Sequence, residues 1–595
     1  RISRSKIISS MRKRESSFKG ILSKATKSLM MRNGADSVKL SSLEDLALTR
    51  KAGATLNEVK LGKRRRSCTE NSRSLNVLCH DASPLQAEEM VHHLLRGLGS
   101  HGQVVHIEEI SSRKPNYVEI PHLLSGVIKS ALQRIGITRL YSHQADSIQA
   151  SLEGKNVVVA TKTSSGKSLC YNVPILEMLW HNPLACALYL FPTKALAQDQ
   201  MRALLAITHG FDNSLNIGIY DGDTSQEERL QLRDKARLLI TNPDMLHVSI
   251  LPFHGQFNRF LSNLRFVVID EAHCYKGAFG SHVALIFRRL RRICSHVYGS
   301  HPSFIFSTAT SANPEEHAMK LANLPAVEFV KNDGSPSGSK LFVLWNPPLK
   351  NVSQSTEALK IEAASSDDKK SSRKDDVALS PIVEVSCLFA EIVQHGSRCI
   401  AFCKTRKLCE LVLCYTREIL SETSPNLVDR VYSYRGGYIA EDRRRIEGKL
   451  FNGTICGIVA TNALELGIDV GHIDVTLHLG FPGSISSLWQ QAGRSGRRGN
   501  QSIAIYVAFE GPLDQYFMKF PAKLFNCPIE YCHVDTDNDQ VLQQHLSCAA
   551  FEYPLSLLHD EKYFGQCFGS VAVKLENKGI LRINGYRAWT YVGDE

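Results

Sequence analysis

The chain has 595 residues, 43% of them apolar, so it is long enough for three or four domains with real cores and is not a disordered protein. Its formal charge of +12 is concentrated in residues 1–66, which hold 18 Lys and Arg against 5 Asp and Glu, whereas the remainder holds 53 against 54. A uniformly basic surface is therefore excluded, and contact with a polyanion must depend on local charge and main-chain N–H groups. Sixteen cysteines without a CxxC pair are typical of a reduced intracellular protein, and no apolar run approaches the roughly 18–20 residues of a membrane span.

Residues 1–84 are predicted to form a disordered, basic N-terminal tail, because they are rich in Ser, Lys and Arg without a sustained apolar period. Within the tail, Arg50-Lys51 and Lys63-Arg64-Arg65-Arg66 are separated by eleven residues. This spacing is typical of a two-part nuclear import signal and predicts the nucleus as location. The alternative is a basic arm that is merely solvated. Residues 85–125 are expected to form an accessory segment of mixed helix and strand.

Two α/β domains are predicted next, at residues 126–349 and 381–535. In each, short apolar runs alternate with helical stretches, which predicts a parallel sheet covered on both faces. The runs lie at 156–160, 187–191, 238–241, 266–269 and 304–307, then at 399–402, 431–433, 457–460 and 503–507. Between the domains, the charged low-complexity residues 350–380 are predicted as a linker or loop.

Residues 536–595 are predicted to be winged-helix-like. A helix-rich stretch leads to two alternating strands that flank Asn584-Gly585, and Asn-Gly between such strands is the strongest short hairpin signal. The alternative is a plain β-ribbon on the surface.

A phosphate-binding loop is predicted directly after the run 156–160, where Gly166-Lys167-Ser168 opens a helix. Lys167 would hold the β- and γ-phosphates of ATP, and Ser168 would bind Mg²⁺. Two positions that often carry glycine are Thr161 and Ser164 here. Gln144 stands 23 residues before Lys167, where a glutamine can read adenine. The expected nucleotide contacts are therefore Gln144, Thr161, Thr163, Ser165, Gly166, Lys167 and Ser168, together with Gly467 and Asp469 of the second domain.

The acidic pair Asp270-Glu271 follows the apolar run 266–269. Asp270 would orient Mg²⁺, and Glu271 would polarise the attacking water. His273 is placed to couple the site to the strand end at 307–310. The alternative, a solvated acidic loop, leaves the charge at a strand end uncompensated.

Arg494 and Arg497 are predicted as arginine fingers on the γ-phosphate, supplied from the second domain by a glycine-rich helix start. In the alternative interpretation, the two arginines form ion pairs with acidic residues on the protein surface. If both arginines act as fingers, the ATP site is complete only when the two domains close. Each turnover would then open and close the cleft between the domains.

Loops from both domains are expected to hold the phosphates of a nucleic-acid strand without reading its sequence. Each follows a strand and begins a helix, so each could instead only cap that helix. The residues are Pro192, Thr193, Lys194, Thr241, Asn242, Lys404, Thr405, Arg406 and Thr461.

Taken in order, these motifs resemble those of superfamily-two helicases. The amino-acid sequence at residues 140–144, 270–273, 275–282 and 434–438 resembles that of the Hrq helicases. These are the RecQ-four-like DEAH-box DNA helicases, which are related to bacterial mitomycin-repair helicases. The resemblance covers about residues 85–595. It implies two tandem RecA-like domains with a winged-helix-like domain, and a 3′-to-5′ DNA helicase that uses ATP and Mg²⁺ on single-stranded and duplex DNA. It also implies a role in DNA repair, notably of crosslinks, with possible oligomers or repair-protein partners.

The family also carries a C-terminal domain with four zinc-binding cysteines. The sequence ends at Glu595 without it, so a truncated last domain and no zinc site are expected here. Two other functions remain open at this point. A DEAH-type RNA helicase shares the motor, and the altered positions Thr161 and Ser164 would fit a nucleic-acid-binding scaffold whose ATPase has decayed.

Overall fold

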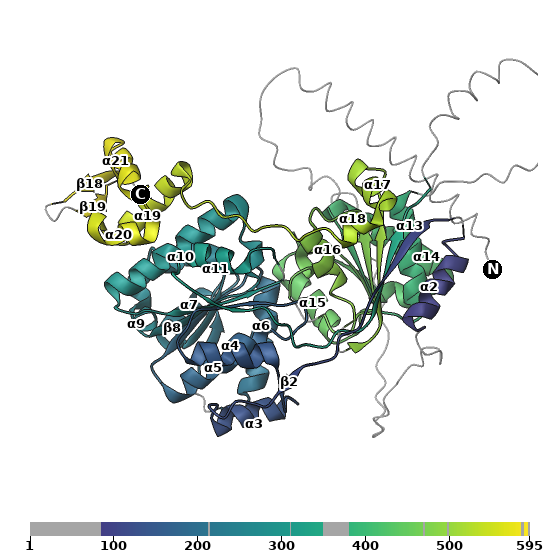
Figure 1. Ribbon diagram of the computed structural model, residues 1–595, viewed down its shortest axis with the longest axis horizontal. Helices are drawn as coiled ribbons and strands as arrows, with labels where there is room; N and C mark the ends of the chain where they lie inside the picture. The colour runs from purple at the N-terminus through teal and green to yellow at the C-terminus, as the bar shows by residue number, and fades with distance from the viewer. Residues whose placement is uncertain are drawn as a thin grey trace, which may run out of the picture. The chain divides into compact units, whose positions relative to one another are not determined.

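The computed structural model describes residues 85–100, 102–211, 215–309, 311–348, 380–467, 470–496, 499–584 and 588–592. Within them lie two seven-stranded sheets, a three-stranded sheet and a two-stranded sheet (Figure 1). The predicted tail 1–84 and nearly all of the predicted linker 350–380 lie outside the described residues. No helix in the described ranges is long and apolar enough to cross a membrane.

The first large sheet is entirely parallel, as the apolar runs predicted. Its strands, in spatial order, are β10 (Glu328–Val330), β4 (Val157–Ala160), β9 (Ser303–Thr308), β8 (Leu264–Ile269), β5 (Cys186–Leu190), β7 (Leu238–Thr241) and β6 (Ile217–Ile219). Because parallel strands point the same way, the carboxyl ends of β4, β9 and β8 lie side by side at one edge, where such sheets bind ligands.

Both faces of this sheet are buried. Val157 and Val159 belong to the apolar cluster on one face, whereas Val158 belongs to the cluster on the other. One face is covered by α3 (Gly126–Arg134), α4 (Ser142–Leu152), α5 (Ser168–His181) and α6 (Lys194–Thr208), the other by α10 (Gly277–Val297) and α11 (Pro314–Ala322) (Figure 1). This two-sided burial explains why the strands read as continuous apolar runs.

Shorter elements complete the first lobe. They are β2 (Tyr117–Val118), β3 (Leu140–Tyr141), α7 (Gln226–Lys235), α8 (Pro243–Met245), α9 (Asn258–Ser262), η1 (Leu246–Ile250), η2 (His254–Phe257) and η3 (Ala272–Cys274).

The second large sheet has the order β1 (Val104–Ile110), β11 (Lys340–Trp345), β16 (Ser502–Val507), β15 (Val475–Leu479), β12 (Cys399–Cys403), β14 (Gly457–Ala460) and β13 (Val431–Tyr434). All neighbours are parallel except β1 and β11. The helices of this lobe are α2 (Ala87–Arg96), α13 (Pro381–Gln394), α14 (Arg406–Thr423), η4 (Pro425–Arg430), α15 (Ala440–Phe451), η5 (Asn462–Leu464), α16 (Ile485–Ala492), α17 (Pro512–Lys519) and α18 (Pro521–Phe525).

Two strands differ from the predicted division of the chain. Strand β11 falls within the predicted first domain, 126–349, but it joins the second sheet between β1 and β16. Strand β1, from the predicted accessory segment 85–125, pairs antiparallel with β11 at the edge of the same sheet. An apolar run indicates that a strand is buried but not which sheet contains it. The domain boundary predicted from sequence order was therefore wrong.

The C-terminal residues form three helices and a small antiparallel sheet, the predicted winged-helix arrangement. The elements are α19 (Asp539–Glu552), β17 (Leu555–Ser556), α20 (Leu557–Phe564), α21 (Phe568–Asn577), β18 (Leu581–Ile583) and β19 (Ala588–Tyr591). Strands β18 and β19 pair as the predicted hairpin, although Gly585 of its turn lies outside the described residues.

Helix α10 of the first lobe holds this C-terminal unit through buried ion pairs. Arg289 bonds both carboxylate oxygens of Glu552, and Arg292 bonds Asp560 through Nε at 2.7 Å and Nη2 at 3.1 Å. All four side chains are almost fully buried. Removing one member of a buried pair leaves an uncompensated charge and costs about 3–5 kcal/mol, so these contacts fix the unit to α10.

Candidate active site

The predicted phosphate-binding loop runs from the end of β4 into α5. Nζ of Lys167 donates to the main-chain oxygens of Thr161 at 3.0 Å and Lys162 at 2.8 Å. The hydroxyls of Thr161 and Ser165 lie 2.7 Å apart. The lysine is thus folded back over its own loop, in a position where phosphate oxygens could replace the two carbonyl groups as acceptors.

The backbone of this loop is left-handed at two places. Ser164, which stands where glycine is common, has φ of 64°, and Gly166 has φ of 77°. A non-glycine residue pays roughly 1–2 kcal/mol for that conformation. At Gly166 the backbone angle favours glycine, and a Cβ atom there would also lie 2.7 Å from Nε2 of Gln144 and displace the end of that side chain.

The two carboxylates lie at the end of β8, beside the end of β9. Oδ1 of Asp270 accepts the main-chain N–H of Glu271 at 3.0 Å, and Oδ2 accepts the Tyr171 hydroxyl at 3.3 Å. Glu271 has φ of 49°, an unusual left-handed backbone for this residue type. Strained residues of this kind persist where the surrounding structure over-determines them, as at functional sites.

Charges at the site shift one another's protonation. Burial and the neighbouring Glu271 raise the pKa of Asp270 to about 7. Burial acts to raise the pKa of Glu271 as well, but attraction to His273, Lys167 and Arg494 outweighs it, and the pKa is lowered. Burial lowers the pKa of Lys167, which the two carboxylates oppose. A charged Glu271 is the form that can accept a proton from water.

The donors fit a magnesium ion. Asp270 supplies carboxylate oxygens and Ser168 a hydroxyl, the hard oxygen ligands that Mg²⁺ takes together with phosphate oxygens and water. Both residues line the same cleft. These residues would hold the ion at the phosphates, where it would neutralise charge on them.

His273 lies between the acidic pair and the end of β9. Its Nδ1 lies 3.2 Å from the main-chain N–H of Ala309, 3.4 Å from the Thr308 hydroxyl and 3.5 Å from Oε2 of Glu271. The ring thus accepts the N–H of Ala309 at the end of β9 and lies beside the Glu271 carboxylate, and the predicted coupling of the two stays a prediction. Thr310, at the end of that predicted segment, lies outside the described residues.

The second lobe contributes to the same cleft, whose volume is about 680 Å³. Gly467 donates its main-chain N–H to Oε1 of Glu271 at 2.9 Å. Arg494 lines the cleft and is itself buried, with Nε 3.0 Å from the main-chain oxygen of Glu465. Arg494 therefore lies on the cleft beside the first lobe, its role as an arginine finger stays a prediction, and Asp469 and Arg497 lie outside the described residues.

The segment around Arg494 was predicted as a helix start and is instead a helix end. Helix α16 finishes at Ala492, and Gly493 is its C-terminal cap. A Cβ atom at Gly493 would lie 2.0 Å from the Thr163 hydroxyl of the first lobe, so close approach between the lobes explains this glycine.

The buried Lys340 contacts the segment that contains Arg494. Nζ of Lys340, on β11, lies 2.7 to 3.1 Å from four oxygens that share its N–H groups, namely the main-chain oxygens of Ala492 and Ser495 and the hydroxyls of Ser495 and Ser502. Burial lowers the pKa of Lys340 to about 7. Because Ala492 and Ser495 flank Arg494, Lys340 fixes the main chain on both sides of the arginine.

Gln144 lies against the phosphate loop. Its Nε2 donates to the main-chain oxygen of Gly166 at 3.0 Å, and its Oε1 accepts the N–H of Tyr141 at 2.9 Å. Tyr141 lines the cleft and stacks on Tyr117, with ring centroids 5.3 Å apart. The role of Gln144 in reading adenine stays a prediction.

The loops predicted to track a strand all begin helices or end strands, and several cap them. Thr193, Asn242 and Thr405 accept main-chain N–H groups of α6, α8 and α14. The Thr241 hydroxyl donates to the main-chain oxygen of Tyr220, and Thr461 is buried. Lys404 and Arg406 are exposed, and Pro192 is partly exposed. Capping is therefore observed for three of them, and strand contact stays a prediction.

Lys194 lies in a chain of charges that joins the lobes. Its Nζ is 2.6 Å from Oδ1 of Asp223, and Oδ2 of Asp223 is 2.7 Å from Nη2 of Arg443 on α15. One carboxylate thus bridges a lysine of the first lobe to an arginine of the second. The sequence did not predict the contact between Asp223 and Arg443, because the two residues are 220 positions apart in the chain.

Three comparisons with known proteins agree with this geometry. Residues 141–317 match the DEAD/DEAH box helicase family, residues 384–499 match the helicase conserved C-terminal domain, and residues 534–585 match the winged helix domain of ATP-dependent helicase HRQ1. A phosphate loop and acidic pair on one RecA-like lobe, with an arginine from a second, define a two-lobed helicase core.

Curated relatives are similar over most of the chain. The uncharacterised ATP-dependent helicase YprA of Bacillus subtilis is 39% identical over 494 residues, 83% of this chain and 62% of the relative. ATP-dependent helicase HRQ1 of Saccharomyces cerevisiae is 40% identical over 470 residues, 78% of this chain and 41% of the relative. The chain belongs to the superfamily-two DEAD/DEAH-box helicases, in the group that contains these proteins, and the predicted resemblance is confirmed.

Solved structures support the same grouping. DUF1998 helicase MrfA bound to DNA superimposes with a TM-score of 0.76 at 38% identity, covering 86% of this chain and 64% of that one. The form bound to DNA and AMPPNP gives 0.75 at 37% identity, covering 86% and 67%. The chain thus spans about two thirds or less of the relatives it matches.

Proposed function

We propose that this chain is the motor of an ATP-dependent DNA helicase, in which ATP hydrolysis drives movement along single-stranded DNA and separates a duplex. The observation that carries the proposal is the cleft in which Lys167 and Glu271 of one lobe meet Arg494 of the other. Its volume of about 680 Å³ is in the range of a ligand site, and both lobes line it.

The chain's own residues would act in a simple order. Lys167 and the loop N–H groups bind the phosphates, and Ser168 with Asp270 holds Mg²⁺, which supplies charge neutralisation when bound. Glu271 accepts a proton from the attacking water, because its carboxylate is kept charged by nearby cations. Arg494 stabilises the charge that develops on the transferred phosphoryl group. His273 links Glu271 to the end of β9 and so transmits the state of the site.

DNA as substrate is supported by the relatives, since MrfA, 38% identical, has been solved bound to DNA. The test is strand displacement on duplexes with a 3′ tail or a 5′ tail, each built in DNA and in RNA. We expect ATP-dependent unwinding of 3′-tailed DNA, which Lys167→Ala abolishes. Unwinding of RNA duplexes at an equal or higher rate would contradict the DNA assignment and favour an RNA helicase.

We further propose a role in DNA repair, notably of crosslinks, in the nucleus. Support comes from the resemblance to the Hrq family and from the basic clusters at residues 50–51 and 63–66, which lie outside the described residues. Cells that lack the protein should be sensitive to crosslinking agents and be rescued by the wild type but not by Glu271→Gln. Rescue by that variant would contradict a catalytic role in repair.

A further inference from the structure

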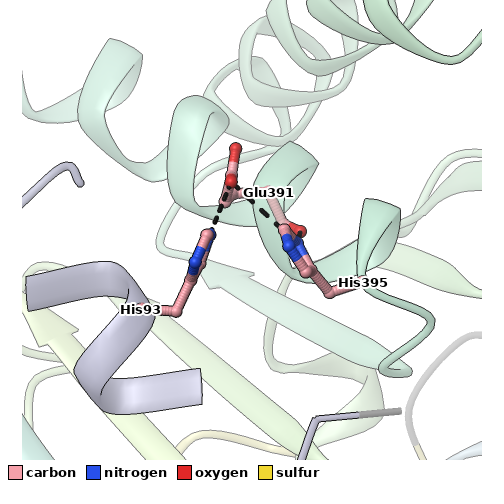
Figure 2. A group of neighbouring side chains, drawn as sticks. All are labelled: His93, Glu391 and His395. Atoms are coloured by element: carbon pink, nitrogen blue, oxygen red, sulfur yellow. Dashed lines mark hydrogen bonds and ion pairs between the residues drawn. The ribbon is translucent and has the colours of Figure 1, made fainter. Parts of the chain in front are cut away.

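Outside the cleft, three side chains with metal-binding atoms meet where α2 lies against α13. They are His93 of α2, Glu391 of α13, and His395, which caps the end of α13 (Figure 2). None of the three lines the ATP cleft. We propose that His93, Glu391 and His395 form a binding site for Zn²⁺ or a similar divalent transition metal, which joins helix α2 to helix α13 within the second lobe.

The ligand atoms already lie close together. Nε2 of His93 is 2.8 Å from Oε1 of Glu391, and Nδ1 of His395 is 3.9 Å from the same oxygen. One ligand atom from each residue lies within 4.8 Å of the other two. Zinc bonds of about 2.0–2.1 Å in a tetrahedron set ligand atoms about 3.3 Å apart, so shifts of about 1.5 Å or less assemble the site.

The side chains are free enough to make those shifts. His93, Glu391 and His395 are 39%, 35% and 32% exposed, so rotation meets no close-packed core. The two imidazole rings are 4.3 Å apart at their centroids, and both approach the carboxylate in Figure 2. Nδ1 of His395 also lies 2.9 Å from the main-chain oxygen of Glu391. The ring keeps that bond if it binds metal through Nε2 and exchanges it if it binds through Nδ1.

The chemistry of the donors selects the metal. Two imidazoles with one carboxylate suit Zn²⁺ and its neighbours, and leave a fourth position for water, which partial exposure admits. Mg²⁺ and Ca²⁺ prefer sites built entirely of oxygen, so they are excluded as the preferred ion. The site is distinct in its ligands from a four-cysteine zinc site.

The consequence is a cross-link between segments far apart in sequence. Helix α2 is otherwise held by the burial of Met90, Val91 and Leu94. A metal bound to both helices would stabilise the docked state of α2. The free energy of this stabilisation would rise with the logarithm of the ratio of metal concentration to Kd. This role requires no contact with ATP.

The test titrates Zn²⁺ alone into the metal-depleted full chain by calorimetry, with Co²⁺ absorption as a second probe. We expect one equivalent to bind, and at least a tenfold loss of affinity in His93→Ala and in Glu391→Gln. His92→Ala is the matched control, because His92 is exposed on the same helix. The control should bind as the wild type does, and ATP hydrolysis should be unchanged in all three variants.

A second readout separates this site from the cysteines. X-ray absorption of the zinc-loaded chain should show nitrogen and oxygen neighbours, and zinc should raise the Tm of the wild type but not of His93→Ala. Sulfur neighbours, equal binding by His93→Ala and the wild type, or an equal loss in the His92 control would each overturn the proposal.

Discussion

The two RecA-like lobes have the same kind of sheet, yet they present different groups to the cleft between them. The first lobe supplies charged side chains, Lys167 after the end of β4 and Asp270 and Glu271 after the end of β8, two strands that flank β9. The second supplies the main-chain N–H of Gly467 and the guanidinium of Arg494. The groups proposed to hold phosphate, metal and water are thus all placed by the first sheet, and the second lobe adds the N–H of Gly467 and the guanidinium of Arg494. Hydrolysis should therefore depend on closure, while ATP binding should not.

The lobes also differ in how their groups are held. In the first, Ser164 and Glu271 are held in left-handed backbone conformations by the structure around them. In the second, Arg494 bonds the main-chain oxygen of Glu465, and Lys340 bonds the chain on both sides of it. Four substitutions test this division of work, beginning with the largest expected effect.

Glu271→Gln should bind ATP as the wild type does and lose turnover by roughly 10²–10⁴-fold, because the metal ligand Asp270 remains while the proton acceptor is lost. Binding of a fluorescent ATP analogue and steady-state hydrolysis measure the two effects. Hydrolysis at the wild-type rate would show that the assigned base is wrong.

Arg494→Ala should leave ATP affinity nearly unchanged and slow hydrolysis on the order of 10³-fold, as expected for a lost arginine finger. Arg445→Ala is the control, since Arg445 is an exposed arginine of the same lobe and is 67% exposed. A large loss of ATP affinity with normal kcat would place Arg494 in ground-state binding and break the comparison between the lobes.

Lys340→Met removes the donor for four hydrogen bonds beneath the arginine segment while keeping a side chain of similar length. We expect kcat to fall about tenfold with little change in KM, because a small misplacement of a catalytic group is costly. The assay is run well below the Tm of the variant. A lowered Tm with normal kcat would mean that Lys340 only stabilises the fold.

Asp223→Asn should have the smallest effect. It removes the charge that ties Lys194 to Arg443, an ion pair whose members are about one quarter exposed. Such pairs contribute roughly 0.2–1 kcal/mol, so single-stranded DNA affinity should change by about fivefold or less. We expect tighter binding, because Lys194 becomes available for phosphate, and fluorescence anisotropy measures it. Weaker binding would contradict the release of Lys194 and would show that the bridge to Arg443 supports DNA binding.

Local sequence predicted the parts of the site that are local in space. The loop at 161–168 and the pair Asp270-Glu271 were found because strand, turn and chemistry lie within a few residues. Lys340, Tyr171 and Glu465 were not, since their roles depend on contacts with segments far along the chain. The same reason explains why β11 was assigned to the wrong sheet. The end of α16 at Ala492 was misread because glycines mark both helix starts and helix ends.

Helix α10 begins at Gly277, four residues after His273, and carries Arg289 and Arg292 to the C-terminal winged helix. With 21 residues it is about 31 Å long, a stiff rod between the hydrolysis site and the winged helix. At its start, α10 is joined to the hydrolysis site by the chain itself. Further along, it is joined to the winged helix by short, buried ion pairs. The winged helix is therefore tied to the first lobe, so a movement of the first lobe relative to the second would carry the winged helix with it.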